Sequence, residues 1–235
     1  MQEKDHTSKH FDAELQHLRG MVLSMGRVAE QQIRYSVEAL RGGDEKLVSR
    51  VITEEARLNA LEREIDEYCA TVLARRTPTA NDLRLVLTTL KISTELERVG
   101  DEAKKLAFAA GRIFVGDRMH APSFADIRLV GGVVTDMLHR ALDGFARLEP
   151  MDAPEIVRLD EEVDQYFRAI LRQLLTYMIE DPRTISPALE VVFIAKALER
   201  IGDHAKNIAK HVVYLTRGED VRHLPVERIE QAVRP

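Results

Sequence analysis

The chain is poor in the residues that mark several common classes of protein. Among its 235 residues there is one cysteine, Cys69, and no tryptophan, and aromatic residues make up only 5%. A single cysteine excludes an intrachain disulfide and fits a reducing compartment. We therefore expect a core built mainly of Leu, Val, Ile and Ala, in which Cys69 is a small buried apolar residue.

Signals for membranes, nucleic acids and common active sites are also missing. No apolar run approaches the roughly 20 residues that span a bilayer, and the polar first ten residues do not resemble a signal peptide. The net charge is −5, without a cluster of Lys and Arg, which disfavours nucleic-acid binding. The sequence contains no Gly-rich phosphate loop, nucleophile elbow or Cys/His metal spacing. We expect a soluble, cytoplasmic protein.

The apolar periodicity is helical almost throughout, and most Pro and Gly residues fall between long periodic stretches. The predicted fold is all-α, with six helices in two tandem three-helix bundles. Three segments follow from these breaks: 1–117 as the first bundle, 118–217 as the second, and 218–235 as a loosely held polar tail. Helix starts are expected at Asp44 as an N-cap, and at Ser123 and Asp152 as capping boxes.

An internal repeat relates the two halves. The segment Leu96–Asp101 reads Leu-Glu-Arg-Val-Gly-Asp, and Leu198–Asp203 reads Leu-Glu-Arg-Ile-Gly-Asp, 102 residues later. Upstream, Leu61–Tyr68 resembles Leu159–Tyr166, 98 residues later. The mid-helix glycine of the motif recurs although Gly costs about 1 kcal/mol there relative to Ala, which suggests a close helix or ligand approach.

Each half carries two pairs of acids at a spacing of four, which places both members of a pair on one helix face. If the two helices of a half face each other, four carboxylates converge and need a compensating cation. Oxygen ligands suit hard cations such as magnesium, calcium, manganese or ferric iron, with zinc possible. The alternative is internal salt bridging by Arg63, Arg98, Arg200, Lys104 and Lys206. The candidate metal ligands are Glu62, Asp66, Glu97 and Asp101 in the first half, and Asp160, Asp164, Glu199 and Asp203 in the second.

The stretch Leu198–Ala209, Leu-Glu-Arg-Ile-Gly-Asp-His-Ala-Lys-Asn-Ile-Ala, resembles the signature of the PhoU family, the accessory and regulatory proteins of bacterial phosphate-specific transport. The resemblance implies a homodimer with multinuclear metal clusters held by carboxylates, the metal being iron, manganese, zinc or magnesium. It also implies negative regulation of the phosphate-starvation response. The implied partners are the transporter's ATPase subunit and a sensor histidine kinase, so the protein would meet a membrane only through them.

The family's ligand positions fall on the eight acids already named, and Asn207 joins them as the Asn of the signature. The first half departs from the signature, because Lys105 stands 102 residues before Asn207. A lysine adds positive charge beside the site. We therefore expect the first-half site to bind metal more weakly than the second.

Three functions compete on these observations. A non-enzymatic signalling adaptor fits duplicated acids that lack a base, a nucleophile or a cofactor motif. A carboxylate-bridged metalloenzyme, such as an oxidase or a phosphohydrolase, needs an open coordination position and usually histidine beside the metal, which these motifs lack. A purely structural helical repeat would leave the acids paired with arginine.

Overall fold

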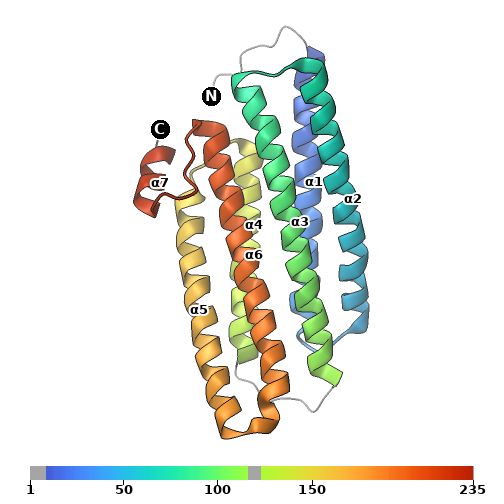
Figure 1. Cartoon of the computed structure of the whole chain (residues 1–235), viewed down its shortest axis with the longest axis vertical. Coiled ribbons are helices and arrows are strands. Elements are labelled where there is room, and N and C mark those ends of the chain that lie inside the picture. The colour runs from blue at the N-terminus through green and yellow to red at the C-terminus, as the bar shows by residue number, and fades with distance from the viewer. Residues whose placement is uncertain (1–8, 116–122, 235) are drawn as a thin grey trace.

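The computed structural model describes residues 9–115 and 123–234, and all regular structure in these ranges is helical. Figure 1 shows long helices lying side by side, with a short seventh helix at one end. The all-α prediction is confirmed. The elements are α1 (Lys9–Ala39), α2 (Glu45–Arg76), α3 (Ala80–Val115), α4 (Ser123–Arg147), α5 (Ala153–Glu180), the 3-10 turn η1 (Pro182–Thr184), α6 (Ile185–Arg217) and α7 (Val226–Val233).

Glycine and capping residues set the helix ends where the chain turns sharply between α1 and α2. Gly43 adopts a φ of 67°, a conformation open to glycine, and lets its amide close on Ala39 O at 2.8 Å. Asp44 then caps α2, since its Oδ1 accepts a hydrogen bond from Lys46 N at 2.8 Å. The capping box expected at Asp152 is wrong, because that carboxylate makes no cap bond and accepts from Arg140 instead. The Ser123 side chain lies outside the described part.

The two bundles, α1–α3 and α4–α6, are joined along their length into one body. The pair α3 and α6 forms the most extensive helix contact in the described part, and α1 also packs on α4. Leu96 of α3 and Ile201 of α6 are fully buried within the shared core. Cys69 is buried as predicted, and burial raises the pKa of its thiol to about 12. The apolar stripes of both repeats therefore serve one continuous core.

Two glycine contacts between α1 and α4 fix the register of the repeat. A Cβ on Gly26 would lie 2.6 Å from Leu142 Cδ1, and a Cβ on Gly131 would lie 2.8 Å from Val37 Cγ2. Gly131 follows Gly26 by 105 residues, and Leu142 follows Val37 by the same number. The two contacts are thus one contact seen from each side of an approximate two-fold axis.

The segment after α6 is ordered by apolar contacts, so the prediction of a loosely held polar tail is wrong. Val221 and Ile229 are fully buried, and Arg217 Nη2 donates to Val233 O at 2.7 Å. Helix α7 packs against α5 and α6 (Figure 1). The sparse apolar residues of this segment lie on one helix face, which a reading of overall polarity misses. None of the helices in the described ranges has the length and apolarity needed to cross a bilayer.

Candidate functional site

The predicted acids of the first half lie together along α2 and α3. Burial raises the pKa of Glu62, and the neighbouring charges of Glu97 and Asp66 raise it further. Burial likewise raises the pKa of Glu97, with Asp101 as the next cause. Within residues 9–115 and 123–234, none of these four carboxylates has a cation within ion-pair distance. The first-half acids therefore act on one another's pKa values without a cation in ion-pair contact, although the charges of Arg63 and Arg98 also act on Glu62.

A fifth acid, Glu55, lies deeper between the same helices and was missed in the sequence. It is 4% exposed, and its Oε2 accepts a hydrogen bond from Gln32 Nε2 of α1 at 3.1 Å. Burial raises its pKa, and the adjacent Asp101 carboxylate opposes its ionisation. Glu55 stands seven residues before Glu62, on the same helix face, and this spacing was the available signal.

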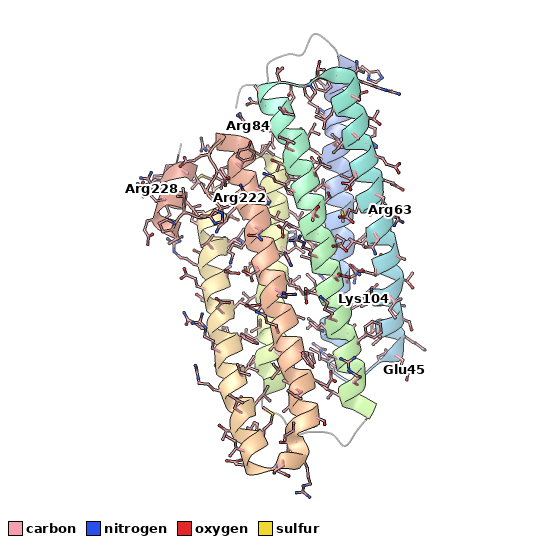
Figure 2. The ribbon with its side chains drawn as sticks, in the orientation of Figure 1. Glu45, Arg63, Arg84, Lys104, Arg222 and Arg228 are labelled. Carbon is pink, nitrogen blue, oxygen red and sulfur yellow. The ribbon has the colours of Figure 1, made fainter. Side chains whose placement is uncertain are left out.

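Several oxygen atoms around Glu55 lack a hydrogen-bond partner in the described part. They are Gln32 Oε1, Glu55 Oε1 and Asn59 Oδ1, all buried from solvent. An unsatisfied buried acceptor costs roughly 1–3 kcal/mol, so the unpartnered oxygens of Gln32 and Glu55, two side chains in hydrogen-bond contact, favour a donor or a cation. The nearest cation is Lys104, whose Nζ lies 3.7 Å from Glu55 Oε1 and whose side chain is 37% exposed. Figure 2 marks Lys104 on α3, facing α2.

The motif glycine of the first half leaves space for this polar group. A Cβ on Gly100 would lie 2.3 Å from Leu58 Cδ2, 2.9 Å from Gln32 Oε1 and 3.0 Å from Glu55 Oε2. The close approach predicted for the glycine is confirmed here. It does not hold for Gly202, where the nearest atoms lie at an ordinary 3.6 Å.

In the second half, lysine and arginine side chains neutralise the predicted ligands. Lys206 donates to Asp160 and, at 2.6 Å, to Asp203 Oδ1. The Nζ of Lys196 lies 2.6 Å from the Glu199 carboxylate, and Arg168 lies 3.6 Å from Asp164. Burial raises the pKa of Asp160, while the Lys206 ammonium opposes that rise. The salt-bridged alternative therefore describes the second half.

The register of the repeat differs from the one that the sequence suggested. Glu55 lies beside Gly100 and Lys104, and Asp160 lies beside Gly202 and Lys206. Asp160 is therefore the counterpart of Glu55, 105 residues away, and not of Glu62 at 98. The two registers differ by seven residues, about two helical turns, so both keep the same face. The counterpart of Glu62 is Phe167, and the first half has an acid pair that the second lacks.

Asn207 points to the other bundle. Its Nδ2 donates to Glu95 Oε2 of α3 at 3.5 Å, and His204 Nδ1 lies 2.6 Å from the same oxygen. The pKa of Glu95 is lowered, because His204 and Asn207 outweigh burial. This contact uses the Nδ2 of Asn207, so its role as a metal ligand through Oδ1 stays a prediction.

Lys105, the charge expected to weaken the first-half site, forms its ion pair with an acid outside the predicted set. Lys105 Nζ donates to Glu102 at 2.9 Å, and Glu102 accepts from Arg200 of α6 as well. Lys105 thus belongs to the contact between α3 and α6. Its charge still acts on the first-half acids, because Lys105 lowers the pKa of Glu97. The weaker binding expected in the first half therefore stays a prediction, and in the second half the lysine that contacts the acids is Lys206.

In the ranges that the structure describes, no three His, Cys, Asp or Glu side chains form a group able to hold a metal ion. The donor set that best fits a hard cation adds the amide oxygens of Gln32 and Asn59 to Glu55 and Asp101, since these oxygens are buried and unpartnered. The second half fits less well, because an ammonium already contacts both Asp160 and Asp203.

Comparisons with known proteins agree with this architecture. The PhoU domain family matches residues 22–110 and 127–212. The two matches start 105 residues apart, which is the offset of the contacts made by Gly26 and Gly131. They end 102 residues apart, which is the offset of the two Gly-Asp motifs. The described helices thus hold two copies of one domain, the second shorter by three residues between α5 and α6.

Relatives match over nearly the whole chain. The chain is 42% identical to the phosphate-specific transport system accessory protein PhoU homolog of Pseudomonas aeruginosa, covering 97% of this chain and 94% of that protein. It is 40% identical to the Escherichia coli accessory protein PhoU, covering 96% and 93%. The crystal structure of PhoU from P. aeruginosa superposes with a TM-score of 0.85 at 42% identity, covering 89% of this chain and 100% of that one. The regulatory protein PhoU from Streptococcus pneumoniae gives a TM-score of 0.82 at 27% identity, covering 90% and 99%. The chain belongs to the PhoU family.

Proposed function

We propose that this protein is a regulatory adaptor of a phosphate-specific transport system and a negative regulator of the phosphate-starvation response in the cytoplasm. The observation that carries the proposal is the identity of 40–42%, over nearly the full length, to proteins named as accessory to that system. Direct contacts with the transporter's ATPase subunit and a sensor histidine kinase, and a homodimeric state, are parts of the same proposal.

A non-enzymatic role fits these relatives better than a carboxylate-bridged metalloenzyme. Their names describe accessory and regulatory proteins. The acids of the second half are also paired with lysine and arginine, whereas a catalytic metal needs an open coordination position.

Complementation tests the regulatory role. The protein would be expressed in a phosphate-replete host that lacks its own accessory protein, and a starvation-induced phosphatase would be measured. We expect phosphatase activity to fall to the repressed level, and the transporter's ATPase subunit to copurify with the tagged protein. Unchanged phosphatase activity with normal amounts of folded protein would overturn the proposal.

Metal binding is a separate part of the proposal and concerns the first half. A hard cation would be held by Glu55 and Asp101 with the amide oxygens of Gln32 and Asn59. Glu62, Asp66 and Glu97 extend the acidic row. Such a cation would neutralise the converging carboxylates and satisfy the unpartnered oxygens. The sequence-based set in the second half, Asp160, Asp164, Glu199, Asp203 and Asn207, ranks lower because Lys206 would have to be displaced.

Elemental analysis of the purified protein tests this ranking. The double variant Glu55→Gln/Asp101→Asn would be compared with its counterpart Asp160→Asn/Asp203→Asn after loading with iron, manganese, zinc or magnesium. We expect the first variant to lose most of the bound metal and the second to lose little. Equal losses, or a larger loss in the second variant, would contradict the ranking. Circular dichroism would confirm that both variants are folded.

A further inference from the structure

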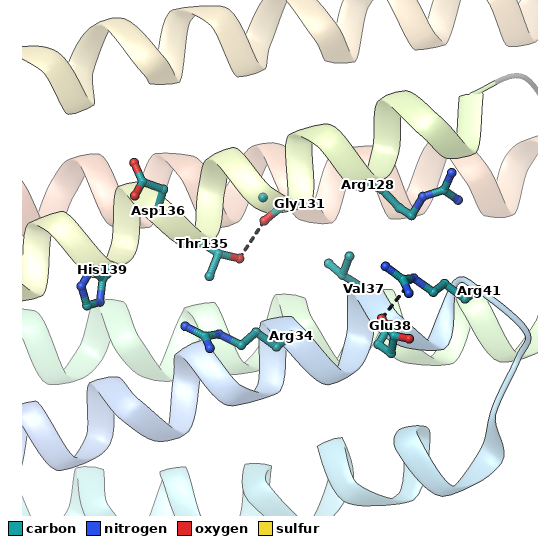
Figure 3. A pocket seen from close by; sticks show the side chains of 10 residues that line it. Arg34, Val37, Glu38, Arg41, Arg128, Gly131, Thr135, Asp136 and His139 are labelled. Carbon is teal, nitrogen blue, oxygen red and sulfur yellow. Dashed lines mark hydrogen bonds and ion pairs between the residues drawn. The ribbon is translucent and has the colours of Figure 1, made fainter.

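A groove of about 520 Å³ lies between α1 and α4, on helices that carry none of the acids predicted from the sequence as metal ligands. Figure 3 shows it bordered by Arg34 on α1, Arg41 in the turn after α1, and Arg128 on α4. The volume lies within the range of small-ligand pockets. The groove thus has the size of a ligand site, with three guanidinium groups along it.

The groove is lined by three arginines and two acids, Glu38 and Asp136. Glu38 pairs with Arg41 at 3.2 Å, and Glu30 lies 3.9 Å from Arg34. Arg128, which also lines the groove, forms no ion pair with an acid among the residues that the structure describes, and the nearby Asp136 lies 3.9 Å from Arg140. Arg41 and Arg128 border the same end of the groove (Figure 3). An unpaired guanidinium beside a second one, on a protein of net charge −5, attracts a small anion.

A mid-helix glycine opens the wall of the groove. Gly131 is explained by packing, since a Cβ there would collide with Val37. Gly132 is different, because a Cβ at that position would meet no atom within 4 Å. Glycine costs about 1 kcal/mol relative to alanine in a helix interior, and no protein contact explains that cost at Gly132. Its absent side chain leaves space that lines the groove and brings the helix backbone within reach of a ligand.

The repeat shows that the fold does not require these residues. In the register of 105 residues, Gly26 corresponds to Gly131, and both glycines serve the packing of α1 on α4. The groove residues near these glycines differ between the two halves. Their counterparts at the other end of the same helix pair are Leu23 for Arg128, Arg27 for Gly132 and Ala146 for Arg41. The fold therefore does not require Arg41, Arg128 or Gly132 at these positions.

We propose that the groove between α1 and α4 binds a small anion that carries one or two phosphate groups. Guanidinium groups match phosphate oxygens in shape and charge and can donate two hydrogen bonds at once. Arg41 and Arg128 hold the anion from opposite sides of the groove, Arg34 lies further along it, and Gly132 leaves the space. The site is separate from the carboxylates of α2 and α3 and does not depend on a metal.

Calorimetric titration of the full chain with inorganic phosphate and with pyrophosphate tests the site. A chelator in the buffer excludes phosphate held by a bound metal, and low salt limits screening of the guanidinium charges. We expect saturable binding of at least one of the two anions, weakened about tenfold or more in Arg128→Gln, because one charge-assisted hydrogen-bond donor is lost. The matched control is Arg172→Gln, an exposed arginine of α5, which should bind as the wild type does.

A second variant separates loss of the site from loss of the fold. Gly132→Leu places a side chain into the open groove at a position where its Cβ meets no atom within 4 Å. Its melting temperature should equal or exceed that of the wild type, because leucine favours a helix over glycine, while anion binding is lost. Absence of binding of both anions to the wild type would overturn the proposal. Equal affinity in the wild type, Arg128→Gln and Gly132→Leu would also overturn it.

Discussion

The two halves have the same helical scaffold, but their buried acids have different partners. In the first half, Glu55 and Asp101 lie near Gln32, and Lys104 stays 3.7 Å from Glu55. In the second half, Lys206 contacts both Asp160 and Asp203. The counterpart of Gln32 is Met137, which brings no oxygen donor. Duplicated acids therefore do not imply a duplicated metal site, since the ammonium group of one lysine can occupy the place of a metal ion.

The largest expected difference between the halves comes from removing each lysine. Lys206→Met leaves the 6% exposed Asp160 without its partner, which should lower the free energy of unfolding by about 3 kcal/mol. Lys104→Met removes a longer and more exposed ion pair and should cost less than about 1 kcal/mol. Urea unfolding followed by circular dichroism measures both, and similar costs would show that the two lysines are equivalent.

A buried histidine should make the second half sensitive to acid. Burial lowers the pKa of His211 to about 4, and its counterpart in the first half is Ala109. The unfolded chain takes up this proton near pH 6.5, so the free energy of unfolding should fall as the pH drops from about 6.5 to about 4. The loss is roughly 3 kcal/mol, at 1.36 kcal/mol per pKa unit.

Comparing the wild type with His211→Leu at each pH isolates this effect. Glu62 and Glu97 work in the opposite direction, since a carboxyl with a raised pKa binds its proton more tightly when folded, and this contribution is present in both proteins. We expect the difference in stability between the two proteins to change by about 3 kcal/mol over that pH window. A difference that stays constant with pH would show that His211 does not hold its proton more weakly in the folded protein.

The two motif glycines should respond differently to alanine. Gly100→Ala places a methyl group 2.3 Å from Leu58 Cδ2 and should cost about 2 kcal/mol through overpacking. Gly202→Ala meets only ordinary contacts at 3.6 Å and should gain up to about 1 kcal/mol from helix propensity. Thermal melting of the two variants measures this, and equal destabilisation would mean that both glycines are needed for packing.

The sequence predicted the helices, the tandem bundles and the grouping of the first-half acids, because these depend on periodicity and spacing. It could not show which residues of α2 correspond to which residues of α5 in the repeat, since a shift of seven residues leaves every side chain on nearly the same helix face. It also could not show the direction of Lys206, which has an acid three residues away on its own helix and another on α5. Glu55 and Asn59 were missed because their importance comes from Gln32, which the fold brings in from α1.

The reciprocal contacts between Gly26 and Leu142 and between Gly131 and Val37 have the form of an isologous dimer interface, in which each member repeats the contact of the other. Here both members belong to one polypeptide. The covalent connection between α3 and α4 keeps each half at a high effective concentration for its neighbour, so the pairing does not depend on protein concentration. Because the two surfaces need not be identical, they have diverged: Arg41, Arg128 and Gly132 line a groove at one end of the α1–α4 pair, and Ala146, Leu23 and Arg27 stand at the corresponding positions of the other end.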